Sequence, residues 1–126
     1  MAMEVALAHE RNAGRKPEDV SKENRGYDIR SCGPDGHIRY IEVKGRAGVG
    51  AVWLTPNEWQ TAQRFGQDYW LDIVVNATSE PQLKCIPDPV HNLRVVEEKE
   101  IVRYIVPMES WREAAEVVTN KSEGGT

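Results

Sequence analysis

The stretch GYDIRSCGPDGHIRYIEVKG, residues 26–45, constrains the fold most, because it predicts a β-hairpin of defined register. Pro34 suits the first position of a type I turn, since its ring already fixes φ near −65°. Gly36 suits the left-handed position that completes a common three-residue hairpin loop. Such a loop makes Gly33 and His37 the closing pair of residues.

This register predicts which side chains share each face of the hairpin. It places Asp28 directly opposite Glu42, and Lys44 lies two residues further along the strand on the same face. Three charged side chains therefore converge on one patch. The opposite face is expected to be apolar, with Ile29 paired to Ile41 and Tyr27 paired to Val43.

The facing carboxylates of Asp28 and Glu42 allow two explanations. Like charges directly opposite on a sheet destabilise it, by up to ~1 kcal/mol. On an exposed face, solvent and nearby basic residues would screen that repulsion. Alternatively, the two carboxylates hold Mg²⁺ or Mn²⁺, which polarises a phosphoryl oxygen, while Lys44 neutralises charge in the transition state. The second explanation predicts phosphodiester hydrolysis.

The rest of the sequence predicts further helices and strands around the hairpin. Thr55 as N-cap, Pro56 and Glu58 form a capping box that begins a helix, and Gly66 ends that helix. We expect Trp53 and Trp70 to be core residues rather than platforms for base stacking. In total the sequence predicts helices over 3–12, 55–66 and 108–118, strands over 26–33, 37–44, 49–55, 68–76, 81–89 and 100–107, and a connector over 15–26.

The order of these elements predicts an α/β protein whose mixed β-sheet is flanked by helices. We expect a single domain over residues 1–119, followed by a flexible tail over 120–126. The first predicted helix begins without an N-cap, which suggests a domain excised from a larger protein. In the helix predicted over 108–118 we expect the inward side chains to be Trp111, Ala114, Ala115 and Val118.

Composition limits the classes of function. The 126 residues contain no apolar run long enough to span a membrane. The two cysteines match no metal-ligand spacing and fit a reducing cytoplasm. The net charge of −4 is uneven, with ten Lys/Arg and nine Asp/Glu in residues 1–64 but six and eleven in 65–126. Any basic surface is therefore expected in the first half, and DNA binding by the chain alone is expected to be weak.

The hairpin resembles the signature of the PD-(D/E)xK nuclease superfamily, in which an aspartate is followed by Glu-x-Lys. Here Tyr27 replaces the proline of the signature, and Glu42-Val43-Lys44 follows Asp28. A wider set of motifs resembles the family named after the C-terminal domain of protein NO VEIN. These motifs are EDVSKENRGYDIRS, RYIEVKGR, LTPNEWQTAQRFGQDYWLDIVVN and CIPDP, and the resemblance covers roughly residues 2–112.

The resemblance implies a restriction-endonuclease-like fold with an α-β-β-β-α-β core plus a C-terminal strand and helix. It also implies roles for individual residues. Asp28 and Glu42 match the metal carboxylates, and Lys44 matches the catalytic lysine. Many members add a glutamate from the first helix, for which Glu4 is preferred here over Glu10. The related Mrr-type restriction nucleases carry a glutamine on the second helix, which Gln60 or Gln63 could supply. Apart from the resemblance, Arg30 and Arg46 flank the charged patch and could contact phosphates, unless they are solvated strand-end residues.

The charged patch and the resemblance together predict a Mg²⁺- or Mn²⁺-dependent DNA phosphodiesterase module, and the resemblance implies that this module is attached to a helicase-like ATPase, as members of the family commonly are. The alternative is a catalytically silent nuclease fold that binds nucleic acid or docks on its ATPase partner.

Overall fold

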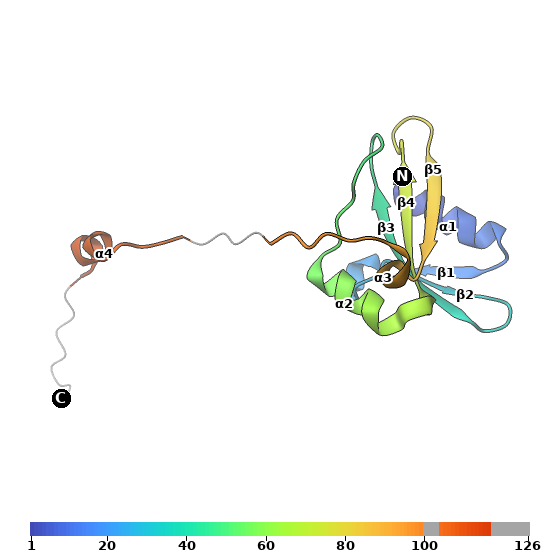
Figure 1. The fold of residues 1–126 in the computed structure, drawn as a ribbon, viewed down its shortest axis with the longest axis horizontal. Helices are drawn as coiled ribbons and strands as arrows, with labels where there is room; N and C mark the ends of the chain where they lie inside the picture. Colours follow the sequence, from blue (N-terminus) through green and yellow to red (C-terminus); the bar gives the residue numbers. More distant parts are fainter. Residues whose placement is uncertain (100–103, 117–126) are drawn as a thin grey trace. The chain divides into compact units, whose positions relative to one another are not determined.

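The computed structural model describes residues 1–99 and 104–116, and Figure 1 shows its elements. It divides into two units, Met1–Val95 and Val96–Thr126. The first unit contains the sheet and most of the helices. Its elements in order are α1 (Ala2–Asn12), β1 (Lys16–Asp19), the 3₁₀ turn η1 (Ser21–Glu23), β2 (Ile29–Cys32), β3 (Ile38–Gly45), α2 (Pro56–Phe65), the 3₁₀ turn η2 (Gly66–Asp68), β4 (Tyr69–Val75), β5 (Gln82–Pro87) and α3 (Pro89–Asn92).

The five strands form one sheet in the order β1-β2-β3-β4-β5. Neighbouring strands are antiparallel except β3 and β4, which run parallel and are joined through α2. The predicted α/β class, a mixed sheet flanked by helices, is confirmed, and it is consistent with a restriction-endonuclease-like fold.

The two long helices pack on opposite faces of this sheet. Ala6 of α1 belongs to an apolar cluster with Ile29 and Ile41. Ala62 of α2 belongs to a second cluster with Tyr27 and Tyr69, in which Tyr40 and Phe65 stack with ring centroids 3.9 Å apart. Successive residues of a strand point to opposite faces, so the α2 face of β3 carries Tyr40, Glu42 and Lys44.

The predicted hairpin register is confirmed where the strands pair. Ile29 lies opposite Ile41, and the Gly33 N–H donates to the His37 carbonyl at 2.8 Å. The pairing between β2 and β3 begins only at Ile29, however, so the predicted strand over 26–33 is too long at its start. The predicted pairing of Tyr27 with Val43 is wrong, because the chain bends at Asp28 and the two side chains join opposite clusters.

The third strand of the core was predicted in the wrong place. Residues 49–55 form no strand, whereas the expected connector supplies β1, which pairs with β2. The segment after β3 is instead fastened to the end of β4, where the Ala77 N–H donates to the Arg46 carbonyl at 2.8 Å. Trp53 in this segment is 63% exposed, so the prediction that it is a core residue is wrong, while Trp70 packs against the α1 cluster.

The predicted start and end of α2 are confirmed. The Thr55 hydroxyl accepts the Glu58 N–H at 3.1 Å, and Glu58 Oε1 accepts the Thr55 N–H at 2.9 Å. β4 has both faces largely buried and β5 is an edge strand, as expected.

The second unit contains α4 (Met108–Ala114). Of the strand predicted over 100–107, residues 100–103 lie outside the described residues, and Tyr104–Pro107 form no strand. The helix predicted over 108–118 is confirmed as far as Ala114, but Ala114 and Ala115 are exposed rather than inward. The Trp111 side chain, Val118 and the predicted tail over 120–126 lie outside what the structure describes. Within residues 1–99 and 104–116, no helix has both the length and the apolar character needed to cross a membrane.

Candidate functional site

Asp28 forms hydrogen bonds with the two residues of β3 that flank Glu42. Its backbone N–H donates to the Ile41 carbonyl at 2.8 Å, and its Oδ2 accepts the Val43 N–H at 2.9 Å. The Asp28 carbonyl in turn accepts the Val20 N–H at 2.8 Å. The Asp28 carboxylate therefore bonds to β3 at a position where continued strand pairing would have used a backbone group. Asp28 lies close to Glu42, as predicted, because of this side-chain hydrogen bond.

Lys44 lies between two glutamates on the α2 face of the sheet. Its Nζ is 3.2 Å from Glu42 Oε2 and 2.8 Å from Glu58 Oε1. Glu58 comes from the capping box of α2, so one carboxylate both fixes the helix start and holds the lysine. The capping box was recognisable in the sequence, but its contact with Lys44 was not.

The acidity of these groups reflects their burial and mutual repulsion. Burial, and after it the charges of Asp28 and Glu58, raises the pKa of Glu42 to about 9. Burial also raises the pKa of Asp28, against the opposing hydrogen bond from Val43. Glu42 therefore holds a proton more tightly than an ordinary glutamate, and Glu58 makes the shorter contact with Lys44.

Lys44 keeps its charge. Burial alone would lower the pKa of its ammonium group, but the hydrogen bond to Glu58 and the charge of Glu42 reverse that effect, and the net shift is upward. A lysine with a raised pKa acts as a fixed positive charge at neutral pH rather than as a proton acceptor.

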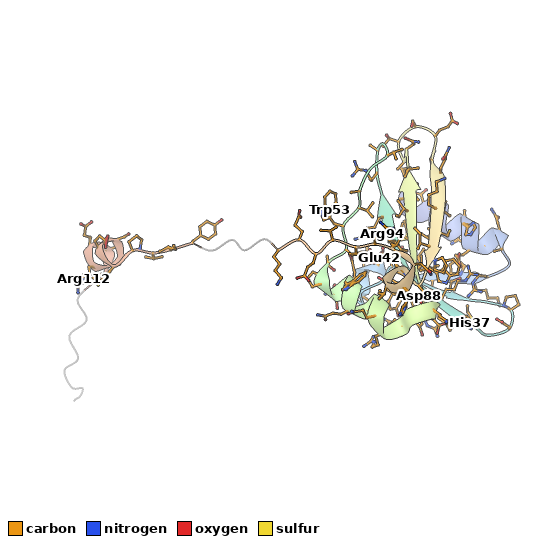
Figure 2. The ribbon with its side chains drawn as sticks, viewed as in Figure 1. His37, Glu42, Trp53, Asp88, Arg94 and Arg112 are labelled. Carbon is orange, nitrogen blue, oxygen red and sulfur yellow. The ribbon has the colours of Figure 1, made fainter. Side chains whose placement is uncertain are left out.

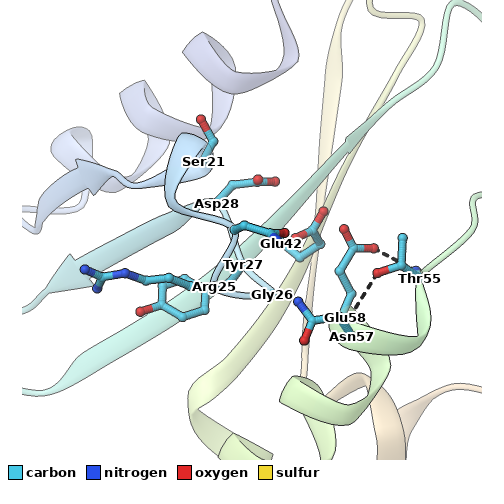
Figure 3. Close-up of a pocket in the computed structure, with 10 residues that line it drawn as sticks. Ser21, Arg25, Gly26, Tyr27, Asp28, Glu42, Thr55, Asn57 and Glu58 are labelled. Carbon is cyan, nitrogen blue, oxygen red and sulfur yellow. Dashed lines mark hydrogen bonds between the residues drawn. The ribbon is translucent and has the colours of Figure 1, made fainter. Parts of the chain in front are cut away.

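The carboxylates of Asp28, Glu42 and Glu58 line a pocket of about 330 Å³ between η1, the start of β2 and α2, which Figure 3 shows. Gly26 shapes its wall: its φ is +85°, and its carbonyl accepts the buried Tyr69 hydroxyl at 2.8 Å. We call this hollow the carboxylate pocket. Its lining consists of Ser21, Asn24, Arg25, Gly26, Tyr27, Asp28, Glu42, Thr55, Asn57 and Glu58.

The donor set suits one mode of divalent-cation binding. Among the described residues, no group of three or more His, Cys, Asp or Glu side chains is arranged to hold an ion. Mg²⁺ is usually held by only one or two carboxylates, together with water and substrate phosphates. Asp28 and Glu42, two carboxylates that line one pocket, fit that mode.

The other predicted ligand lies elsewhere. Glu4 has a side chain that is 74% exposed and pairs with the chain's N-terminal amine at 3.4 Å. Glu10 is buried on the α1 face of the sheet, where its carboxylate lies 3.2 Å from Arg15 Nε and 3.7 Å from Arg39 Nη1. Neither glutamate belongs to the lining of the carboxylate pocket.

The residues that were predicted to contact nucleic acid lie in different parts of the fold. Arg46 Nη1 donates to the Ala51 carbonyl at 2.6 Å and so organises the loop after β3. Arg30 lies on β2 opposite Tyr40, outside the pocket lining. Gln60 lines a second hollow on α2, and Gln63 is exposed on the same helix.

The chain matches the model of a known protein family. The family model described as Protein NO VEIN, C-terminal matches residues 1–86. No curated protein and no solved structure matches the chain.

Proposed function

Because the chain belongs to the protein NO VEIN C-terminal family, we propose that its carboxylate pocket is the active site of a Mg²⁺- or Mn²⁺-dependent DNA phosphodiesterase. One observation carries the proposal: Asp28, Glu42 and Lys44 converge beside a solvent-accessible pocket, and the two carboxylates have raised pKa values. Clusters of perturbed ionisable groups in a cleft mark candidate functional sites.

The chain's own residues have distinct roles in this proposal. Asp28 and Glu42 would hold the cation, which when bound supplies a positive charge beside the phosphate and a more acidic water. The Val43 N–H keeps the Asp28 carboxylate in place. Lys44 contributes a fixed positive charge near the phosphate, and Glu58 holds its ammonium group in position.

The test is a cleavage assay with Mg²⁺ or Mn²⁺ on supercoiled, single-stranded and branched DNA. Lys44→Ala is expected to slow cleavage by about 10²- to 10³-fold, the usual loss when one charge-stabilising group is removed. The matched control is Lys84→Ala, which removes an exposed lysine from β5. Equal rates for the two variants would argue against a catalytic role for Lys44.

A catalytically silent module is the second candidate function. It is favoured by the ion pair between Lys44 and Glu58, which satisfies the lysine without a substrate. Such a module would bind nucleic acid or dock on an ATPase partner. Absence of cleavage by the wild type on every DNA form, with binding retained, would support this candidate.

We also propose that a helicase-like ATPase domain delivers the module to DNA. The net charge of −4 supplies little attraction to phosphates, whereas attachment to another DNA-bound domain raises the effective concentration. Titration of the 126-residue chain against duplex and single-stranded DNA at physiological salt tests this idea. Sub-micromolar binding by the chain alone would contradict the need for delivery.

A further inference from the structure

A second hollow, of about 250 Å³, lies on α2 and shares one lining residue, Asn57, with the carboxylate pocket. Gln60, Thr61 and Arg64 complete its lining. These four residues define what we call the helix hollow. Figure 2 shows the side chains around this part of the sheet and α2, with Glu42 labelled.

The two hollows differ in charge. The carboxylate pocket contains three carboxylates, Asp28, Glu42 and Glu58, and one guanidinium group, that of Arg25, whereas the lining of the helix hollow within the described residues holds two amides, a hydroxyl and a guanidinium group, with no carboxylate. The excess of carboxylates disfavours a phosphate in the first pocket unless a cation is bound. Neighbouring phosphates of the same strand need donors from the protein, and the helix hollow offers them.

The donors of the helix hollow are available to a ligand. Asn57, Gln60 and Arg64 are exposed, and among the described residues their side chains make no hydrogen bond or ion pair with the rest of the protein. The Thr61 hydroxyl, by contrast, donates to the Asn57 carbonyl at 2.7 Å. The Arg64 guanidinium lies 4.8 Å from the centre of the Phe65 ring, which restrains its position.

Helical spacing arranges these donors along a line. Residues 57, 60 and 64 are separated by three and four positions, so they share one face of α2. Seven residues of α-helix span about 10 Å, and stacked nucleotides of one strand rise about 3.4 Å each. The line is therefore as long as the axial rise of roughly three stacked nucleotides, and it begins at the edge of the carboxylate pocket.

We propose that the helix hollow binds the phosphodiester backbone of the DNA strand on one side of the phosphate held in the carboxylate pocket. This inference rests on the proposed function, because it takes DNA as the ligand. It assigns strand binding to Asn57 and Arg64, with Gln60 between them, rather than to Arg46, whose Nη1 donates to a carbonyl of its own loop. The ligand chemistry is the phosphate backbone of one strand, present in single-stranded and in duplex DNA.

The experiment measures binding without cleavage. Fluorescence anisotropy follows labelled short DNA, single-stranded and duplex, in EDTA and at increasing salt starting from low concentration. Arg64→Ala is expected to weaken binding several-fold and to reduce the slope of log K against log salt by about 0.7–0.9, the value for one lost phosphate contact. Asn57→Ala, which removes no charge, is expected to weaken binding without changing the slope.

Two further variants make the result specific. Arg11→Ala removes the same charge from an exposed position on α1, on the opposite face of the sheet, and is expected to match the wild type. Arg64→Lys is expected to restore the slope, which excludes a folding defect as the cause. The comparison of binding to single-stranded and to duplex DNA shows whether the helix hollow also binds a strand that is paired in a duplex.

The inference would be overturned if the wild type showed no binding at low salt, if Arg64→Ala behaved like Arg11→Ala, or if Arg64→Lys failed to restore the slope. Cleavage is not part of this readout. Loss of binding in Arg64→Ala together with absent cleavage by the wild type would support the helix hollow while contradicting the nuclease proposal.

Discussion

Lys44 Nζ lies 2.8 Å from Glu58 Oε1, and the same carboxylate oxygen accepts the Thr55 N–H at 2.9 Å. One side chain thus joins the start of α2 to the charged centre of β3. The pKa of Glu58 is lowered, because its hydrogen bonds with Lys44 and Thr55 outweigh the opposing effect of burial. The position of the helix and the protonation of the site are therefore coupled.

The first prediction follows from this coupling. Glu58→Ala removes half of the capping box and the partner of Lys44, so it is expected to lower the free energy of unfolding by about 1–2 kcal/mol. Urea denaturation measures the loss. Gln63→Ala, an exposed substitution on the same helix, is the control and is expected to change stability by less than about 0.5 kcal/mol. Equal stabilities of the two variants would contradict the bridging role of Glu58.

The second prediction concerns the cation. Asp28→Asn removes one of two repelling carboxylates, so it is expected to cost under about 1 kcal/mol in metal-free buffer or even to stabilise the fold. Saturating Mn²⁺ is expected to stabilise the wild type by about 2.7 kcal/mol at a hundredfold excess over Kd, and to leave Asp28→Asn largely unaffected. Thermal unfolding measures both effects.

The control for the cation is Glu80→Gln, which neutralises an exposed carboxylate in the turn before β5. This variant is expected to retain the full response to Mn²⁺. A melting temperature of the wild type that does not respond to Mn²⁺ would count against the metal site.

The hairpin and α2 were predictable because their signals are local. Turn chemistry at Pro34 and Gly36 fixed the register of the strands, and alternation then placed Glu42 and Lys44 on one face. The boundaries of α2 followed from the capping residue Thr55. Each of these inferences needed only residues close together in the chain.

The misplaced strand and the missed contact depended on distant residues. β1 has the sequence KPED, in which proline and charges conceal an edge strand, whereas residues 49–55 are apolar and resemble one. Tyr27 changes face because Asp28 bonds to Val43 through its side chain. The approach of Glu58 to Lys44 depends on how α2 packs across the sheet, which no local pattern specifies.

The third prediction concerns pH and the α1 face of the sheet. Asp72 on β4 is almost fully buried, its Oδ2 has no hydrogen-bond partner within the part of the chain that the structure describes, and burial raises its pKa to about 6. The folded state thus holds this proton more tightly than the unfolded state. The stability that the protonated carboxyl contributes is complete below about pH 4 and is lost as the pH rises through about 6.

Asp72→Asn, which cannot ionise, is therefore expected to be more stable than the wild type by about 1–3 kcal/mol at pH 7.5. The difference should shrink as the pH falls toward 4. Chemical denaturation of both proteins across this range measures it, and groups that do not interact with Asp72 contribute equally to both. A difference independent of pH would show that Asp72 is not the titrating group.

The last prediction tests the glycine that brings the loop before β2 against α2. Gly26 has φ +85°, and a Cβ built on it would lie 2.2 Å from Thr61 Oγ1 and 2.9 Å from Thr61 Cβ. Gly36 in the hairpin turn has nearly the same φ, +84°, but nothing lies within 4 Å of its Cβ position. Gly36→Ala is therefore expected to cost about 1 kcal/mol through backbone strain alone. Gly26→Ala adds a collision with a buried side chain and is expected to cost about 3 kcal/mol or more.

Because the Gly26 carbonyl also accepts the Tyr69 hydroxyl and Gly26 lines the carboxylate pocket, this variant should lose Mn²⁺-dependent stabilisation as well. Urea denaturation of the two alanine variants, with and without Mn²⁺, separates the shared strain from the collision, and equal losses would refute the close approach of the loop to α2.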